Sequence, residues 1–244
     1  SALLAVLIYR FSENITNNKK ERLWVTFIFA FGTLFFTYST AYFSRISASF
    51  FLFCSFYLLF LMKEDRLKKT KKLLFLTGFL SAISINLDYS TILLTGLFFI
   101  YLISFFRGKK IIYYFIGILV PIILLMSYHY AVYDNPLKSS YQYHRDLNGQ
   151  EYIAEKELNL PNLERLWGLS FSPEKGFFFF MPFMLLSFIG IFEGFRKKKF
   201  IRELILILSI FLVIFILNAS LNGSWKGNCA FGPRHMLVVI PFLI

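Results

Sequence analysis

The chain has little charge, few histidines and almost no cysteine for its 244 residues. Charged residues make up 16% of it, whereas a soluble domain of this size holds about 25%. The 2 cysteines and 3 histidines form no spacing typical of a metal site, and the cysteines do not by themselves indicate a disulfide. The absence of P-loop, GxSxG and HExxH motifs disfavours a primary ATPase, a serine hydrolase of that type and a zincin.

Apolar residues take the place of the missing charge, at 57% of the chain. Seven apolar stretches, each near the length that crosses a hydrocarbon core, alternate with polar connections. They cover residues 23–43, 46–62, 73–87, 89–106, 111–133, 177–195 and 200–218. Residues 1–9 and 235–244 are interpreted as partial helices of a truncated chain. The pattern predicts an all-α, polytopic transmembrane helical bundle that forms a single domain with outer-face loops.

Two of these boundaries depend on length and charge. Residues 73–106 as one helix would be about 50 Å long, too long for one ordinary crossing. A break at Asn86-Leu87-Asp88 predicts two short helices, and 23–62 is divided around Arg45 in the same way. The outer loops are then residues 134–176 and 219–234. In the first, we expect a surface helix within 150–161 and a second helical turn at 162–167, with Leu163, Leu166 and Trp167 on one interfacial face.

Positive charge is concentrated in the connections on one side of this bundle. If each stretch crosses once, the basic segments 10–22, 63–72, 107–110 and 196–202 all fall on the same side. By the positive-inside rule this side is cytoplasmic, which predicts a plasma (inner) membrane protein whose functional loops face outward. The net charge of +12 is then explained by topology and contact with membrane lipids. Nucleic-acid binding is not expected, and the sequence does not indicate an oligomeric state.

Two charged residues lie within or beside predicted crossings, where an ionisable group is costly. Asp88 is either a polar hairpin tip in contact with outer water or a carboxylate that faces a cavity and serves as a base. Arg45 either extends to the interface or binds an anionic headgroup. Both interpretations of each residue stay open at this point.

The densest polar cluster spans residues 222–235. Trp225 offers an apolar face with a donor, and Lys226 and Arg234 offer cationic donors. Pro233 precedes a predicted helix start, where free amides and a guanidinium together favour an anion. We therefore predict a lipid-phosphate site at Arg234 and Lys226, with Arg45 as a weaker third member; the alternative is an interfacial turn. His129 is expected to be a packed or interfacial histidine, and His144 and His235 have no metal-site partner in the sequence.

Three segments resemble a known superfamily. They are Gly32-Thr-Leu-Phe-Phe-Thr-Tyr-Ser-Thr-Ala-Tyr-Phe-Ser-Arg45, the outer-loop stretch from Tyr133 to Pro182, and Trp225-Lys-Gly-Asn-Cys-Ala-Phe-Gly-Pro-Arg-His235. Together they resemble the GT-C glycosyltransferases that use polyprenyl-phosphate sugars, in the protein-mannosyltransferase and aminoarabinose-transferase-like group. Relatives often carry His where this chain has Arg45.

The resemblance implies an integral-membrane glycosyltransferase that moves a sugar from a polyprenyl-phosphate donor to an acceptor on the outer face. Its main acidic residue is expected upstream of Ser1, with Asp88 as a weaker candidate in this chain. Tyr141, Tyr143, Trp167 and Trp225 are candidates for the acceptor or sugar side. No cofactor is identified, and a divalent-metal requirement, the donor sugar and the acceptor stay open. The alternatives are a transporter or flippase of a lipid-linked saccharide, or a non-catalytic polytopic membrane protein.

Overall fold

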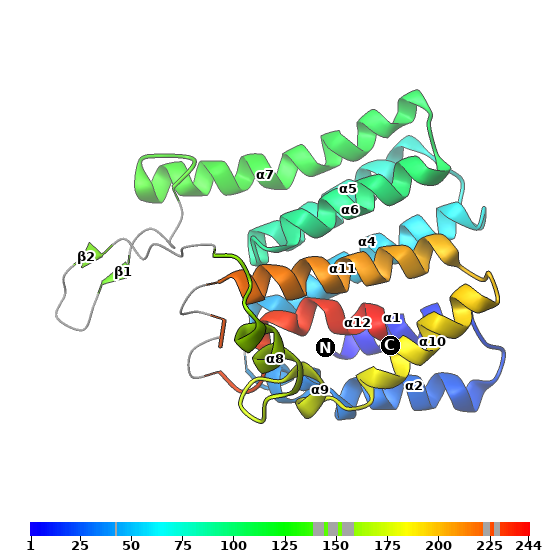
Figure 1. The fold of residues 1–244 in the computed structure, drawn as a ribbon. Helices are drawn as coiled ribbons and strands as arrows, with labels where there is room; N and C mark the ends of the chain where they lie inside the picture. The colour runs from blue at the N-terminus through cyan, green and yellow to red at the C-terminus, as the bar shows by residue number, and fades with distance from the viewer. Residues whose placement is uncertain (42, 139–143, 146–150, 153–158, 222–224, 227–229) are drawn as a thin grey trace.

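The protein is described by a computed structural model that covers residues 1–41, 43–138, 144–145, 151–152, 159–221, 225–226 and 230–244. Its architecture is helical, apart from one antiparallel pair of two-residue strands (Figure 1). The elements are α1 (Ala2–Ser12), α2 (Lys19–Gly32), α3 (Leu34–Ser39), α4 (Ser44–Lys63), α5 (Lys71–Leu87), α6 (Thr91–Phe105), η1 (Lys109–Ile111), α7 (Ile112–Tyr133), β1 (His144–Arg145), β2 (Glu151–Tyr152), α8 (Leu163–Phe171), α9 (Phe177–Phe180), α10 (Met184–Arg196), α11 (Ile201–Ser220), η3 (Arg234–Val239) and α12 (Ile240–Leu243).

Among the described residues, three helical segments are long and apolar enough to cross a membrane: Ser44–Lys63, Lys109–Tyr133 and Ile201–Ser220. Other predicted crossings are shorter or interrupted. The stretch 23–43 breaks at Thr33, whose extended backbone ends α2 and whose hydroxyl accepts a hydrogen bond from the Phe35 amide that starts α3. The stretch 177–195 breaks at Pro182, which has no amide hydrogen to continue a helix from α9.

The division predicted at Asp88 agrees with the structure, and the burial of its side chain excludes one of the two environments left open. Helix α5 ends at Leu87 and α6 begins at Thr91, because Asp88 adopts an extended backbone and its Oδ1 accepts from the Ser90 amide at 3.1 Å. The two helices run antiparallel (Figure 1). Asp88 is only 6% exposed, so it is not a hairpin tip in outer water.

The four basic connections lie at one end of the bundle, on the right in Figure 1. Contacts join them: Lys63 Nζ lies 3.2 Å from a carboxylate oxygen of Glu203 at the start of α11, and Arg66 donates to Asn14 in the α1–α2 connection. We call this the basic end. The segments 10–22, 63–72, 107–110 and 193–203 contain 18 of the 26 basic and 6 of the 14 acidic residues, so the net charge of +12 belongs to them and the rest of the chain is balanced.

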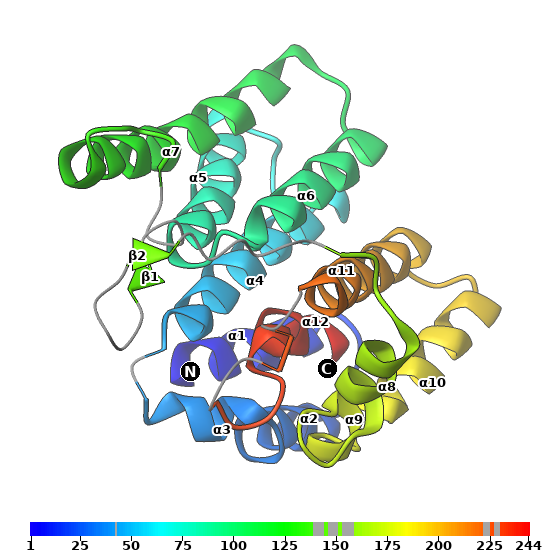
Figure 2. The ribbon, with the colours of Figure 1, turned by 60° about the vertical axis from the view of Figure 1, so that its left-hand side comes forward.

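The segment η3–α12 lies in the middle of the bundle, with α1, α4 and α11 around it (Figure 2). The residues from Met236 to Ile240 are fully buried there. The predicted partial helix at 235–244 is therefore mostly a 3-10 helix followed by one short α-helical turn that begins at Ile240. This burial fixes the first residues of η3, Arg234 and His235, beside the start of α4 and the end of α11.

Helices α5 and α7 form the closest packing in the fold. A β-carbon added at Gly78 would lie 2.0 Å from the Tyr114 carbonyl oxygen, and one added at Gly117 would lie 2.1 Å from that of Phe75. Small residues that allow helix backbones to approach closely are typical of helix pairs inside membranes. This contact supports α5, and with it the Asp88 turn.

Candidate functional site

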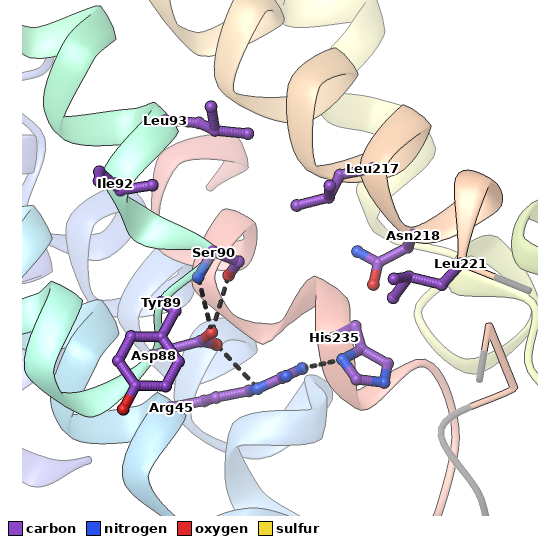
Figure 3. A pocket seen from close by; sticks show the side chains of 10 residues that line it. All are labelled: Arg45, Asp88, Tyr89, Ser90, Ile92, Leu93, Leu217, Asn218, Leu221 and His235. Atoms are coloured by element: carbon purple, nitrogen blue, oxygen red, sulfur yellow. Dashed lines mark hydrogen bonds and ion pairs between the residues drawn. The ribbon is translucent and has the colours of Figure 1, made fainter. Parts of the chain in front are cut away.

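A pocket of about 400 Å³ opens at the end of the bundle opposite the basic end. It lies between the start of α4, the α5–α6 turn, the end of α11 and the start of η3 (Figure 3). One part of its wall is polar and the other is apolar. The lining residues are Arg45, Asp88, Tyr89, Ser90, Ile92, Leu93, Leu217, Asn218, Leu221 and His235.

An ion pair between Arg45 and Asp88 forms the polar wall. Arg45 Nε lies 2.8 Å from Asp88 Oδ2, and the two side chains are 13% and 3% exposed. The other carboxylate oxygen, Asp88 Oδ1, accepts from the amide and the hydroxyl of Ser90 at 3.1 and 2.9 Å. A buried carboxylate is tolerated only when its charge is compensated in this way. The pairing joins the start of α4 to the α5–α6 turn.

His235 extends this polar wall from η3. Its Nδ1 lies in hydrogen-bond contact with Arg45 Nη1. A guanidinium can only donate, so Nδ1 is the acceptor and the ring proton of the neutral imidazole is on Nε2. Arg45 thus contacts a carboxylate through one nitrogen and an imidazole through another. The three side chains come from three separate parts of the sequence.

A second guanidinium lies close to this group. The Cζ atoms of Arg234 and Arg45 are each 6.0 Å from the centre of the Phe43 ring, a distance at which a cation is attracted to an aromatic face. Arg234 Nε is buried without a hydrogen-bond partner, and in the described part of the chain Arg234 makes no ion pair. The described cluster therefore has two guanidinium charges and one carboxylate, which leaves one positive charge available to an anion.

Tyr89 connects the pocket to α7. Its hydroxyl lies 3.0 Å from His129 Nε2, and His129 Nδ1 lies 3.3 Å from the carbonyl oxygen of Pro136. Because a carbonyl only accepts, Nδ1 donates to Pro136 and Nε2 accepts a hydrogen bond from the Tyr89 hydroxyl. His129 is 6% exposed, in line with the expected packed histidine. The pair holds the Asp88 turn against the end of α7.

The structure separates the other predicted residues from this pocket. Lys226 Nζ lies 2.8 Å from a Glu174 carboxylate oxygen, so its charge is matched locally, and both side chains are about half exposed. The Trp225 ring packs on Gly168 of α8, where an added β-carbon would lie 2.5 Å away. Trp167 is 65% exposed on α8.

Helix α8 begins at Leu163, within the helical turn predicted at 162–167. Leu163 and Trp167 are both exposed. The expected helix within 150–161 lies largely outside the described residues, although Glu151 and Tyr152 form β2. Tyr141 and Tyr143 also lie outside the described residues.

Sequence reasoning did not single out two buried residues at this end. Lys175 is 6% exposed and donates through Nζ to the Ala230 carbonyl, which joins the α8–α9 connection to the segment before η3. Asn218 lines the pocket near the end of α11, and its amide nitrogen donates to Ile214 within that helix. No local pattern marks Lys175, because its partner lies 55 residues away in the chain. Over the described residues, no group of three or more His, Cys, Asp or Glu side chains could hold a metal.

Fold and pocket together define an all-helical protein with membrane-compatible helices and a buried Arg–Asp ion pair at one end. The chain belongs to a family of unknown function, DUF6427, whose model matches residues 1–156. The match includes Arg45 and Asp88, whereas Arg234 and His235 lie beyond it. Searches of curated proteins and of solved structures found no match.

Proposed function

We propose that this protein is an integral-membrane glycosyltransferase that moves a sugar from a polyprenyl-phosphate carrier to an acceptor on the extracytoplasmic face. The observation that carries the proposal is the buried Arg45–Asp88 pair near the guanidinium of Arg234, which makes no ion pair with the described residues. Such a site supplies a carboxylate for an acceptor hydroxyl and a spare cation for a phosphate. The contact of Asp88 with Arg45, one of the candidate phosphate ligands, supports this expectation from the sequence.

The proposed membrane placement follows from charge. With the basic end in the cytoplasm of a cell with an inner membrane, the Asp88 pocket faces the opposite side. A lipid-linked donor would reach it from the bilayer. The apolar part of the pocket wall, formed by Ile92, Leu93, Leu217 and Leu221, would contact the first isoprene units of the carrier.

The proposed reaction is a displacement at the anomeric carbon of the sugar. The acceptor hydroxyl oxygen forms a bond to this carbon while the bond from the carbon to the phosphate oxygen breaks. The bonding electron pair leaves with the lipid phosphate, and the hydroxyl proton passes to Asp88. Arg234 would stabilise the charge that develops on the phosphate, and Arg45 would orient the Asp88 carboxylate through their contact.

A transporter of a lipid-linked saccharide would need the phosphate site but no base. Binding of undecaprenyl phosphate is therefore measured with the full-length protein in nanodiscs. Release of lipid phosphate from a polyprenyl-phosphate sugar is measured separately, in native membranes that contain the protein. We expect Asp88→Asn to keep binding and lose release. Unchanged release in Asp88→Asn would refute the assignment of Asp88 as base. Equal binding of undecaprenyl phosphate and undecaprenol would refute the phosphate site.

A further inference from the structure

A second cavity, of about 530 Å³, runs along α10 toward the basic end. Its walls come from α1, α2, α10, α11 and the residues of α12. We call it the α10 groove. Phe183 lies at one end of α10 and Lys197 directly follows the other end, about 20 Å away along a helix of this length. The groove is apolar along most of this path and has charged residues only near the basic end.

The cationic mouth of the groove is fixed by the way α10 ends. The amide of Lys198 donates to the Phe195 carbonyl at 3.1 Å and the amide of Lys199 donates to the Gly194 carbonyl at 3.0 Å. With Lys198 in the left-handed region at φ 52°, this is the Schellman arrangement that closes a helix C-terminus. Lys197 and Lys199 both line the groove as a result.

The charge at this mouth is not fully compensated. Glu193 is shared by Arg196 and Lys197, each 3.2 Å from one of its carboxylate oxygens. Lys199 makes no ion pair in the described part of the chain. Three cations thus face one carboxylate where an apolar groove ends. Basic pockets between membrane helices on the cytoplasmic side are typical binding sites for anionic lipid headgroups.

We propose that the α10 groove binds an anionic glycerophospholipid, with its phosphate beside Lys199 and Lys197 and an acyl chain along α10. The order of residues along the groove favours this occupant, because the lysines at one end suit a phosphate and the apolar residues along α10 suit an acyl chain. This site is separate from the Asp88 pocket and at the opposite end of the bundle. It does not depend on the proposed transferase activity.

Binding is measured by native mass spectrometry on the full-length protein with phosphatidylglycerol, and with phosphatidylcholine of the same acyl chains. We expect preferential retention of phosphatidylglycerol and a loss of about tenfold in Lys197→Ala/Lys199→Ala, since each lysine near a lipid phosphate contributes to binding. Gly190→Leu tests the apolar part: a β-carbon there meets no atom within 4 Å, so added bulk enters the groove without a backbone clash. It should also lower retention.

The matched control is Lys68→Ala/Lys110→Ala, which removes the same charge from exposed positions at the same end but outside the groove. It should retain phosphatidylglycerol like the wild type. An equal loss in this control would overturn the proposal in favour of general attraction to a basic surface. Equal retention of the two lipids by the wild type, or normal retention in both groove variants, would overturn it as well.

Discussion

Among the described residues, each end of the bundle holds one buried carboxylate, and the two carboxylates have different surroundings. At the basic end, Glu203 accepts from the Tyr101 hydroxyl at 2.5 Å and lies 3.2 Å from Lys63 Nζ, within the first turn of α11. At the opposite end, Asp88 pairs with Arg45 and lines an open pocket. Both are compensated, but only Asp88 is placed where a bound molecule could reach its neighbours.

The comparison shows that the net charge of a region does not indicate whether its charged residues line a binding pocket. The segments of the basic end contain all of the net positive charge, mostly on exposed side chains in short connections. Charge of this kind sets orientation in a membrane and contributes little to stability when paired at the surface. The few charges of the Asp88 pocket are buried, and a buried ion pair is costly enough to indicate a function.

The largest expected effect concerns the sides that the two ends face. In a background with Cys54→Ser and Cys229→Ser, we expect an impermeant thiol reagent on intact cells to label Lys226→Cys and not Lys68→Cys, Lys109→Cys or Lys198→Cys. Labelling should also occur at Asn148→Cys, which lies outside the described residues. Permeabilised cells supply the control for reactivity. Labelling of Lys109→Cys in intact cells without labelling of Lys226→Cys would reverse the two ends.

The next effect separates the two carboxylates by activity. Asp88→Asn should lower sugar transfer about 10²- to 10⁴-fold, the range that loss of a general base produces. Its matched variant at the other end, Glu203→Gln, should keep transfer close to wild type. Initial rates with equal amounts of inserted protein measure both. If the two variants lose activity equally, burial rather than position in the pocket explains the effect.

The third effect concerns Arg234, the cation that lies with Arg45 at the Phe43 ring. Arg234→Ala should cost about 2–4 kcal/mol of transition-state stabilisation, by analogy with removal of one preorganised donor to developing charge. Arg234→Lys should already weaken donor use, because an ammonium cannot form the bidentate contact. Arg165→Ala is the control: it removes a guanidinium that donates to the Ala219 carbonyl, outside the pocket lining. Wild-type transfer and donor affinity in Arg234→Ala would make Arg234 an interfacial anchor.

The smallest effect is on stability at the basic end. Glu203→Gln keeps an acceptor for the Tyr101 hydroxyl but removes the charge that faces Lys63, so the free energy of unfolding should fall by about 1 kcal/mol. Thermal unfolding in detergent measures this change, with Lys63→Met/Glu203→Gln as the companion variant that removes both charges. A double variant less stable than Glu203→Gln alone would show that Lys63 stabilises the fold independently of Glu203.

The sequence by itself determined the helical class, the positions of many helices and the grouping of the basic connections. Hydropathy identified α4, α7 and α11, and the charge pattern placed four connections on one side before any contact was known. It also located the break between α5 and α6 at Asp88. These properties follow from residues close together in the chain, or from sums over segments, so no knowledge of partners is needed.

Two interruptions show the limit of hydropathy alone. Residues 23–43 and 177–195 are apolar enough to be predicted as crossings, but Thr33 and Pro182 divide them. The cause is local hydrogen bonding, which an average over a window does not detect. The hydroxyl of Thr33 accepts from an amide two residues ahead, and Pro182 lacks the amide that would continue the helix.

The partners of the charged residues were decided only by the tertiary structure. The sequence placed Arg45 with Lys226 and Arg234 as phosphate ligands, whereas the fold pairs Arg45 with Asp88 and Lys226 with Glu174. It also brings His235 onto Arg45. The physical reason is range: an ion pair requires atoms within about 4 Å. Which helix ends meet at that distance depends on how the whole bundle packs around η3.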